Sequence, residues 1–278
     1  MNMNFLQSIV MGIVSGLAEM LPISSEAHRA LFRTFFGIDS EDAVFRLLVH
    51  ISCLIAVCLF YSGEIIALRK ANQMMKIPPK RRRGTLNMAH AYTVKLLRSA
   101  VIVMILCKIP TLSLQFMERS LLLLSFALMI NGLLLLIPRL VRGGNMDSRN
   151  MPKINGLLMG LGAGLSVFPG ISPVGAVLAV GHWRTVDRKF ALKFSYILLI
   201  PVLFVKIIFD FANLVMGGAA AFSGIGLLCA LAGAVAAGFA ANWGMRIMNT
   251  LAERADFSIF SYYSWGIALL SFTLYLMI

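Results

Sequence analysis

Apolar stretches of about 20 residues recur along this chain, and they restrict what it can fold into more than any other feature does. A helix needs about 20 consecutive apolar residues to cross the hydrocarbon core of a membrane. Charged residues make up only 13% of the 278 residues, against about 25% in soluble domains. We therefore expect an all-α polytopic membrane protein, with spans near residues 44–62, 93–110, 120–138, 189–210, 222–242 and 258–277.

The net charge of +13 could by itself suggest a nucleic-acid partner. The positions of the basic residues argue against one, because they cluster in short loops between the apolar segments. That distribution is the topology signal of a multi-pass membrane protein. We expect the bilayer, and no nucleic acid, as the partner of this surface.

One stretch interrupts the apolar pattern near the N-terminus: residues 21–28, with the sequence LPISSEAH. Pro22 must break a helix that arrives from residues 5–20, because proline lacks an N–H and clashes with the preceding turn. Either Ser24 or Ser25 can cap a second helical piece, residues 24–36. Neither piece is long enough to span the membrane, so a re-entrant hairpin is predicted. The start of its second helix would suit an anion such as phosphate.

The pattern of this stretch restarts in the second half of the chain. Residues 11–24 and 159–172 align without a gap and share six identical residues, and each segment has a proline near its break, Pro22 and Pro169. Each half then reads as one re-entrant hairpin followed by three spans. Three spans end on the opposite side, so repeat two (151–278) must be inverted relative to repeat one (1–140). Such inverted repeats place a site near the bilayer midplane.

The basic residues assign an orientation to this arrangement. In the two-repeat topology, 18 of the 25 Lys and Arg residues fall in loops on one side and five on the other. The positive-inside rule makes the first side cytoplasmic. The basic loop 69–92 is then cytoplasmic, and both termini are outside.

Ionisable and hydroxyl side chains at the first break are candidates for chemistry. Glu19 lies in an apolar hairpin, where an acid is a functional hypothesis by default; the alternative is a structural carboxylate that binds backbone N–H groups. Ser24 and Ser25 have helix capping as their alternative role. His28 lies three residues after Ser25 on the same helical face, so it could act as base for that serine or attack phosphorus itself.

Further polar residues fall near the expected site. Arg29 follows His28, and Arg46 and His50 lie one turn apart at the start of a span, so they share a face. Arg46 could equally be a residue that snorkels to the membrane interface. Lys206 and Asp210, four apart on another span, are expected to neutralise each other.

The motif from Gly16 to His28 resembles the bacterial undecaprenyl-pyrophosphate phosphatase family, also called the bacitracin-resistance family. The family pattern is E-G-L-x-E-x-L-P-x-S-S-x-x-H, and a second family motif, P-G-x-S-R-S, is similar to residues 169–174. Residues 191–201 also look like a family segment. The resemblance implies an inverted-repeat enzyme of the bacterial cytoplasmic membrane. It would remove a phosphate from undecaprenyl pyrophosphate with the help of a divalent cation, Mg²⁺ or Ca²⁺.

The resemblance, together with the polar residues that lie near the motif, gives the expected site. The expected catalytic residues are Glu19, Ser25 and His28, with Glu19 also the candidate metal ligand. The expected substrate-binding residues are Ser24, Arg29, Arg46, His50, Gly170 and Ser172. The chain departs from the family pattern at several points. Ser15 and Pro173 replace a motif Glu and the motif Arg, Val174 replaces a Ser, and Arg46 and His50 replace an acid and a Gln.

Two function classes follow from these observations. The first is a lipid-pyrophosphate phosphatase that recycles the carrier lipid of cell-wall synthesis. The alternative is a non-hydrolytic polyprenyl-phosphate binding protein or flippase that uses the same cavity, which an inverted repeat would suit. A polyprenyl phosphate or pyrophosphate lipid is the expected partner in both, and a homodimer is left open.

Overall fold

The chain folds as a set of helices. This computed structural model describes residues 3–38, 43–81, 84–108, 117, 120–141, 144–216, 224–254 and 257–277. Within these residues there are eleven α-helices and no β-strand. The helices are α1 (Phe5–Met20), α2 (Ser25–Phe36), α3 (Ala43–Phe60), α4 (Ser62–Met75), α5 (Met88–Lys108), α7 (Leu121–Leu140), α8 (Lys153–Leu165), α9 (Pro173–Trp183), α10 (Arg188–Met216), α11 (Gly224–Arg254) and α12 (Ser258–Met277). The expected all-α class is confirmed.

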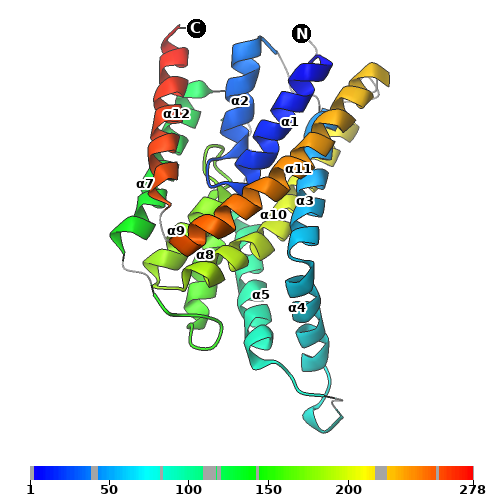
Figure 1. Ribbon diagram of the computed structural model, residues 1–278, viewed down its shortest axis with the longest axis vertical. Coiled ribbons are helices and arrows are strands. Elements are labelled where there is room, and N and C mark those ends of the chain that lie inside the picture. The colour runs from blue at the N-terminus through cyan, green and yellow to red at the C-terminus, as the bar shows by residue number, and fades with distance from the viewer. Residues whose placement is uncertain are drawn as a thin grey trace.

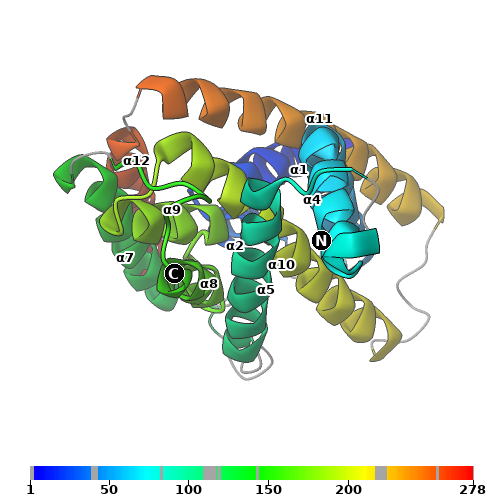
Figure 2. The same cartoon turned by 90° about the horizontal axis from the view of Figure 1, so that it is seen from below.

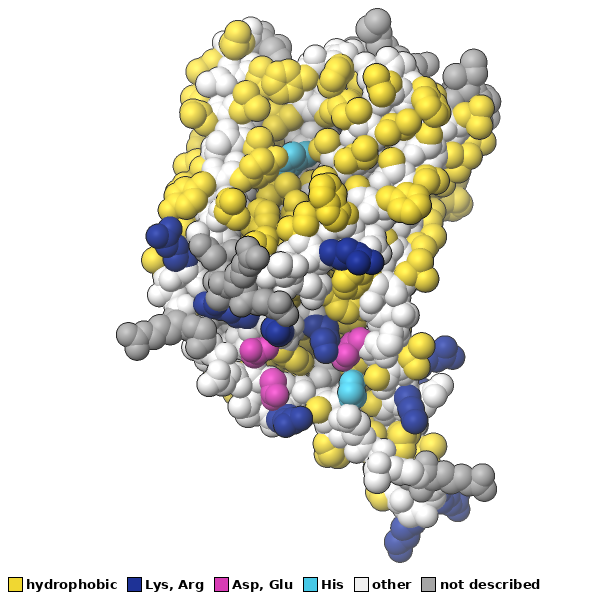
Figure 3. Space-filling model, in the orientation of Figure 1, with side chains coloured by type: hydrophobic (Ala, Val, Ile, Leu, Met, Phe, Trp, Pro, Cys, Tyr) yellow, Lys and Arg dark blue, Asp and Glu magenta, His cyan; other side chains and the backbone are white. Residues whose placement is uncertain are grey.

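Six of the described helices are long and apolar enough to cross a membrane. They are α3, α5, α7, α10, α12 and the segment Gly226–Ala252 of α11, and each coincides with one of the six predicted spans. Large apolar side chains such as Leu59, Phe126 and Phe239 remain exposed on these helices, as lipid-facing positions require. Figure 3 shows one hydrophobic face, with its charged side chains gathered toward the lower end. The chain is therefore a multi-pass membrane protein.

The two chain ends lie at the same end of the molecule, and the connection between α4 and α5 lies at the opposite end (Figure 1). Helix α4 occupies part of the segment that was expected to be a loop between the first two spans. Arg82 and Arg83 of the predicted basic loop 69–92 lie outside the described residues. Seen from below, α11 runs across one side of the molecule (Figure 2), where it packs against α1 and α3.

The first predicted break is present at Pro22. Helix α1 ends at Met20 and α2 begins at Ser25. Ser24 occupies the N-cap position of α2, but its side chain makes no capping hydrogen bond. Its backbone has φ 64°, a conformation that non-glycine residues rarely adopt and that is concentrated at functional sites.

The second break separates α8 from α9. Here Ser172 does cap the following helix, since its Oγ accepts a hydrogen bond from the N–H of Gly175 at 3.2 Å. Pro173 occupies the first turn of α9, where its missing N–H leaves no bond unmade. Gly170 has φ 108°, so only glycine adopts this turn without strain.

A buried amide joins the two breaks. Asn131 of α7 donates from Nδ2 to the carbonyl oxygen of Pro22 at 3.0 Å and to Ser264 Oγ at 3.1 Å. Its Oδ1 accepts from the N–H of Ser172 at 2.9 Å. In addition, a Cβ built on Gly175 would lie 3.0 Å from Pro22 Cβ. The two breaks, far apart in sequence, therefore lie against each other.

Glycines of the repeated pattern allow close helix packing. A Cβ on Gly16 of α1 would lie 2.1 Å from the carbonyl oxygen of Ala237 on α11. A Cβ on Gly160 of α8 would lie 2.4 Å from the carbonyl oxygen of Ala100 on α5. Small residues at such positions let two backbones approach within membranes.

We predict that Gly16→Ala destabilises the protein, because its new Cβ meets backbone that cannot move independently. Overpacking of this kind costs about 1–3 kcal/mol, which corresponds to a fall of roughly 2–12 °C in the unfolding temperature in detergent. Gly266→Ala is the control, since α12 leaves open space around that position. Equal unfolding temperatures for the two variants would contradict the packing argument.

We also predict that Asn131→Leu loosens both breaks together. The substitution leaves the carbonyl of Pro22 and the N–H of Ser172 without their buried partner, at about 1–3 kcal/mol for each group. Amide hydrogen exchange should then speed up around residues 21–24 and 170–175 at the same time. Asn249→Leu is the control, because Asn249 bonds Tyr61 Oη and the carbonyl of Met245 instead. Faster exchange at only one break would argue against a shared tie.

Candidate active site

Four polar side chains meet where the first helix breaks. The carboxylate of Glu19, at the end of α1, accepts a hydrogen bond from Ser25 Oγ. Its other oxygen lies 2.8 Å from Lys206 Nζ of α10. Lys206 Nζ also lies 2.5 Å from Glu26 Oε1 of α2, and Glu26 Oε2 lies 3.4 Å from Ser25 Oγ. A hydroxyl, two carboxylates and an ammonium thus form one cluster.

A second cluster of charges joins α3 to α10. Arg46 Nε lies 2.6 Å from Asp210 Oδ1, and His50 Nδ1 lies 2.5 Å from Asp210 Oδ2. Arg46 and His50 lie on the same face of α3, as their spacing predicts. The expectation that Lys206 and Asp210 neutralise each other is wrong. Each has its partners on other helices instead, Lys206 on α1 and α2 and Asp210 on α3.

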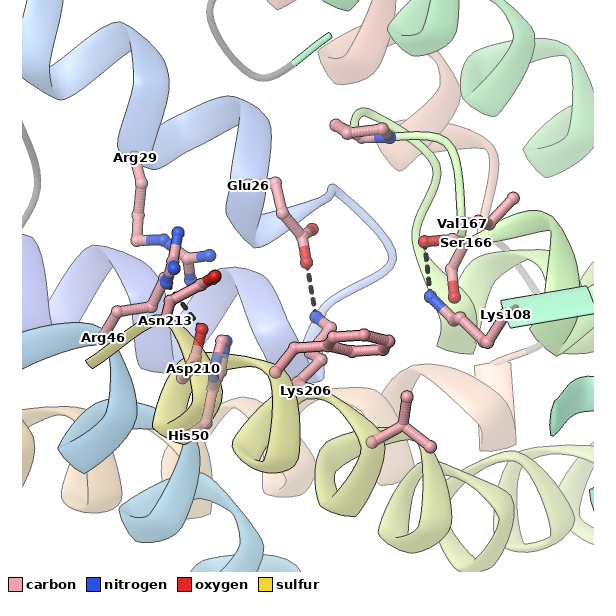
Figure 4. A pocket seen from close by; sticks show the side chains of 13 residues that line it. Glu26, Arg29, Arg46, His50, Lys108, Ser166, Val167, Lys206, Asp210 and Asn213 are labelled. Atoms are coloured by element: carbon pink, nitrogen blue, oxygen red, sulfur yellow. Dashed lines mark hydrogen bonds and ion pairs between the residues drawn. The ribbon is translucent and has the colours of Figure 1, made fainter. Parts of the chain in front are cut away.

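These clusters border one cavity of about 60 Å³. Figure 4 shows their side chains converging on it from α2, α3 and α10, with Lys108 and Ser166 on the other side. Lys108 Nζ donates to the carbonyl oxygen of Ser166 at 2.7 Å. The charged and polar lining residues are Glu26, Arg29, Arg46, His50, Lys108, Ser166, Lys206, Asp210 and Asn213.

The lining carries more positive than negative charge. Arg29, Arg46, Lys108 and Lys206 supply four positive groups, against the two carboxylates of Glu26 and Asp210. A cleft lined by a surplus of one sign focuses its potential and concentrates ions of the opposite sign. Arg29 is only 3% exposed, so its charge acts within the protein rather than in solvent. The cavity therefore suits an anion.

His28 is held away from Ser25. Its Nδ1 lies 2.7 Å from the carbonyl oxygen of Ser24, and its Nε2 lies 2.7 Å from Tyr263 Oη. The His28 and Tyr263 rings are stacked with centroids 5.6 Å apart. The expected Ser25–His28 pair is not formed in this arrangement, and Glu19 is the partner of the Ser25 hydroxyl.

The structure places only some of the predicted site residues at the cavity. Arg29, Arg46 and His50 line the cavity, and Glu19 and Ser25 adjoin it through Lys206 and Glu26. Gly170 and Ser172 are not among its described lining residues. Both are buried in the second break, whose nearby residues Ser166, Val167 and Pro169 line the cavity instead.

Comparison with known proteins places this chain in a family. The model of the family "Bacitracin resistance protein BacA" matches residues 8–270. The chain belongs to this family. It is 28% identical over 276 residues to undecaprenyl-diphosphatase 4 of Bacillus thuringiensis subsp. konkukian, which covers 98% of both chains. It is 29% identical over 274 residues to undecaprenyl-diphosphatase 1 of Shouchella clausii, which covers 97% of this chain and 96% of that one. It is also similar to undecaprenyl-diphosphatase of Methanobrevibacter smithii, 28% identical over 277 residues and 97% of each chain.

The polar residues of this BacA-family chain do not fit a divalent cation. The two carboxylates at the first break share the Lys206 ammonium, which would repel a metal ion between them. Among the described residues, no group of three or more His, Cys, Asp or Glu side chains could hold a metal ion. Mg²⁺ is usually held by one or two carboxylates together with substrate phosphates, and here the carboxylates face an ammonium instead.

Several residues of the site were missed or misassigned from the sequence. Lys206 and Lys108 are basic residues inside or at the end of apolar spans, and that position alone marks functional candidates. Glu26 lies within the quoted motif, but the family pattern assigns no residue type there. Asn213 and Tyr263 carry no sequence signal, because only the packing of α10 and α12 brings them near the site.

Proposed function

We propose that this protein hydrolyses undecaprenyl pyrophosphate to undecaprenyl phosphate and inorganic phosphate, which recycles the carrier lipid for cell-wall synthesis. The observation that carries the proposal is the Ser25–Glu19 hydrogen bond beside a cavity with surplus positive charge. Full-length similarity to several undecaprenyl-diphosphatases supports it. A divalent cation is implied by the resemblance alone and has no part in the steps below.

Ser25 is the proposed nucleophile. Its hydroxyl already donates to Glu19, which can accept the proton during attack. Ser25 Oγ bonds to the terminal phosphorus, the bridging P–O bond breaks, and undecaprenyl phosphate leaves with the electron pair. Water then attacks the phosphoserine, its oxygen bonds to phosphorus, and Ser25 Oγ leaves and regains a proton. His28, the other candidate nucleophile, would instead fix the carbonyl of Ser24 and so the turn that presents Ser25.

The cationic lining would hold the phosphate groups. Arginine binds phosphate oxygens through parallel N–H donors, and Arg29 and Arg46 both border the cavity. Phosphoryl transfer depends mainly on positioning and on stabilising charge at the phosphate oxygens. The family motif has an arginine at the position of Pro173. We therefore propose that Arg46 and Arg29 supply the positive charge that this arginine would provide.

A polyprenyl tail has a place beside this cavity. An apolar groove of about 580 Å³ is lined by residues of α5, α8, α9 and the α8–α9 connection, including Leu161, Leu165 and Phe168. Val167 lines both the groove and the charged cavity. A lipid whose pyrophosphate enters the cavity could therefore keep its chain in apolar surroundings, which supports a lipid substrate.

The inverted repeat and its re-entrant hairpins are part of the proposal. Gly12 and Gly16 of α1 pack against α11, and the matching Gly160 and Gly164 of α8 pack against α5. In the repeat scheme α11 and α5 are the second spans after their hairpins. Each hairpin would then pack on the equivalent helix of the other repeat, which supports an inverted relation.

We predict that purified protein releases phosphate from undecaprenyl pyrophosphate. Ser25→Ala and Arg46→Ala should each lower turnover by about 10²-fold or more, because they remove the nucleophile and a charge that stabilises the transition state. Ser125→Ala and Arg98→Ala are the matched controls, since their side chains bond Leu122 and Asn72 away from the cavity.

Two outcomes would count against this assignment. Hydrolysis that survived both site substitutions would defeat the choice of residues. No hydrolysis in the unmutated protein, with polyprenyl phosphate still bound and binding weakened by Arg46→Ala, would favour the non-hydrolytic binding protein or flippase.

The proposed orientation puts the α4–α5 connection in the cytoplasm and both termini outside, because that connection is rich in Lys and Arg. In a variant without the four native cysteines, Lys80→Cys should resist a membrane-impermeant thiol reagent in intact cells. Asn4→Cys should react. The reverse labelling pattern would overturn the orientation and leave the fold untouched.

A further inference from the structure

Lys206 occupies a specific place between two carboxylates. Its Nζ lies 2.8 Å from Glu19 Oε1 and 2.5 Å from Glu26 Oε1, and these carboxylates come from different helices. The Lys206 side chain is 11% exposed, and those of Glu19 and Glu26 are 2% and 12% exposed. Two carboxylates this close and this buried require a positive partner, because their repulsion is weakly screened in such surroundings.

Either an ammonium or a divalent cation could provide that positive charge, but both cannot do so at once. Mg²⁺ takes oxygen ligands at about 2.0–2.1 Å in octahedral geometry. Glu19 Oε1 and Glu26 Oε1, which such an ion would have to bind, already contact Lys206 Nζ. A metal ion between them would have to displace the ammonium, which is anchored on α10 and cannot diffuse away.

We propose that the Lys206 ammonium takes the place of a divalent cation between Glu19 and Glu26. The protein then acts on its pyrophosphate substrate without a metal ion. This inference rests on the proposed phosphatase function for its consequence in hydrolysis, but the occupancy of the carboxylate pair can be measured by itself.

The position of Lys206 suits it to a role in the proposed reaction as well as in stability. An ammonium has three N–H donors, and the two ion pairs use two of them. Lys206 also lines the anion cavity, so its charge reaches both the carboxylate that holds Ser25 and a phosphate bound beside it. It would orient Glu19 toward the Ser25 hydroxyl and stabilise charge on the phosphate oxygens.

The ion pair of Lys193 with Glu64 provides a matched comparison. Lys193 lies on the same helix, α10, and its Nζ is 3.1 Å from Glu64 Oε2, but its side chain is 45% exposed and away from the cavity. Lys193→Met removes a lysine from a salt bridge on α10 without touching the site.

The first measurement uses chelator-treated wild-type protein in detergent. Phosphate release from undecaprenyl pyrophosphate should change by less than about two-fold between excess chelator and added Mg²⁺ or Ca²⁺, whereas loss of acid–base or metal help costs about 10²-fold or more. Paramagnetic resonance should detect no bound Mn²⁺ at equimolar concentration. A ten-fold or greater loss in chelator that Mg²⁺ restores, or one tightly bound Mn²⁺, would overturn the proposal.

The second measurement uses Lys206→Met, which leaves two carboxylates without their cation. This variant should acquire a Mn²⁺ site and a rise in unfolding temperature with Mn²⁺, by mass action. Its hydrolysis should fall and recover in part with divalent cation. Lys193→Met should match the wild type in every readout. Lys206→Met that binds no Mn²⁺ while remaining folded would contradict the assignment.

A double variant and the wild-type results together distinguish a failure of the Lys206 assignment from a failure of the proposed function. Lys206→Met combined with Glu26→Gln removes one carboxylate, so it should fold better than the single variant and gain no Mn²⁺ site. If the wild type hydrolyses nothing with or without cation, the proposed function fails, and the Mn²⁺ measurements alone decide the place of Lys206. If neither variant folds, the chelator and Mn²⁺ results on the wild type decide it.

Discussion

Each of the two breaks leaves backbone groups without a partner inside its own helix, and the rest of this structure depends on how those groups are satisfied. Irregular backbone is tolerated at membrane depth only where protein or a cavity covers it. Here the side chain of Asn131 binds the carbonyl of Pro22 and the N–H of Ser172 at once. The two breaks are thereby placed together, and the residues that follow each break acquire fixed positions.

The charges of the site depend on this placement. Glu19 and Glu26 flank the first break, and α10 brings Lys206 to both of them. One turn further along α10, Asp210 meets Arg46 and His50 of α3. Removing one partner of a buried pair typically costs about 3–5 kcal/mol, because the other charge is left uncompensated. The same contacts therefore hold α10 against the first break and arrange the cavity, so stability must be measured beside activity.

The sequence predicted the features that depend on local pattern. Apolar length located the six candidate membrane spans found among the described helices, and Pro22 located the first break, because both effects act within a short stretch of sequence. The face shared by Arg46 and His50 followed from helical spacing. Pairings between helices were not predictable in this way. Lys206 and Asp210 are one turn apart, and only the folded structure shows that Lys206 binds carboxylates of α1 and α2 while Asp210 binds α3.

The capping roles of the serines show a similar limit. Ser24 and Ser172 end equivalent segments of the repeated pattern, yet only Ser172 caps its helix. The reason is the backbone: Ser172 has the extended conformation of an N-cap residue, φ −77° and ψ 128°, whereas Ser24 has φ 64° and ψ 105°. The Ser24 hydroxyl instead donates to the Glu26 carboxylate at 3.5 Å.

The departures from the family motif form a connected set in this chain. Ser15 stands where the motif has a Glu, and it is fully buried with no hydrogen-bond partner for its Oγ among the described residues. A second carboxylate nevertheless lies beside Glu19, supplied by Glu26 from the other side of the break. Two carboxylates held by a fixed ammonium carry one net negative charge, whereas two held by a divalent cation carry none. Arg46, which stands where the family has an acid, adds positive charge, and the guanidinium groups of Arg29 and Arg46 border the cavity from α2 and α3.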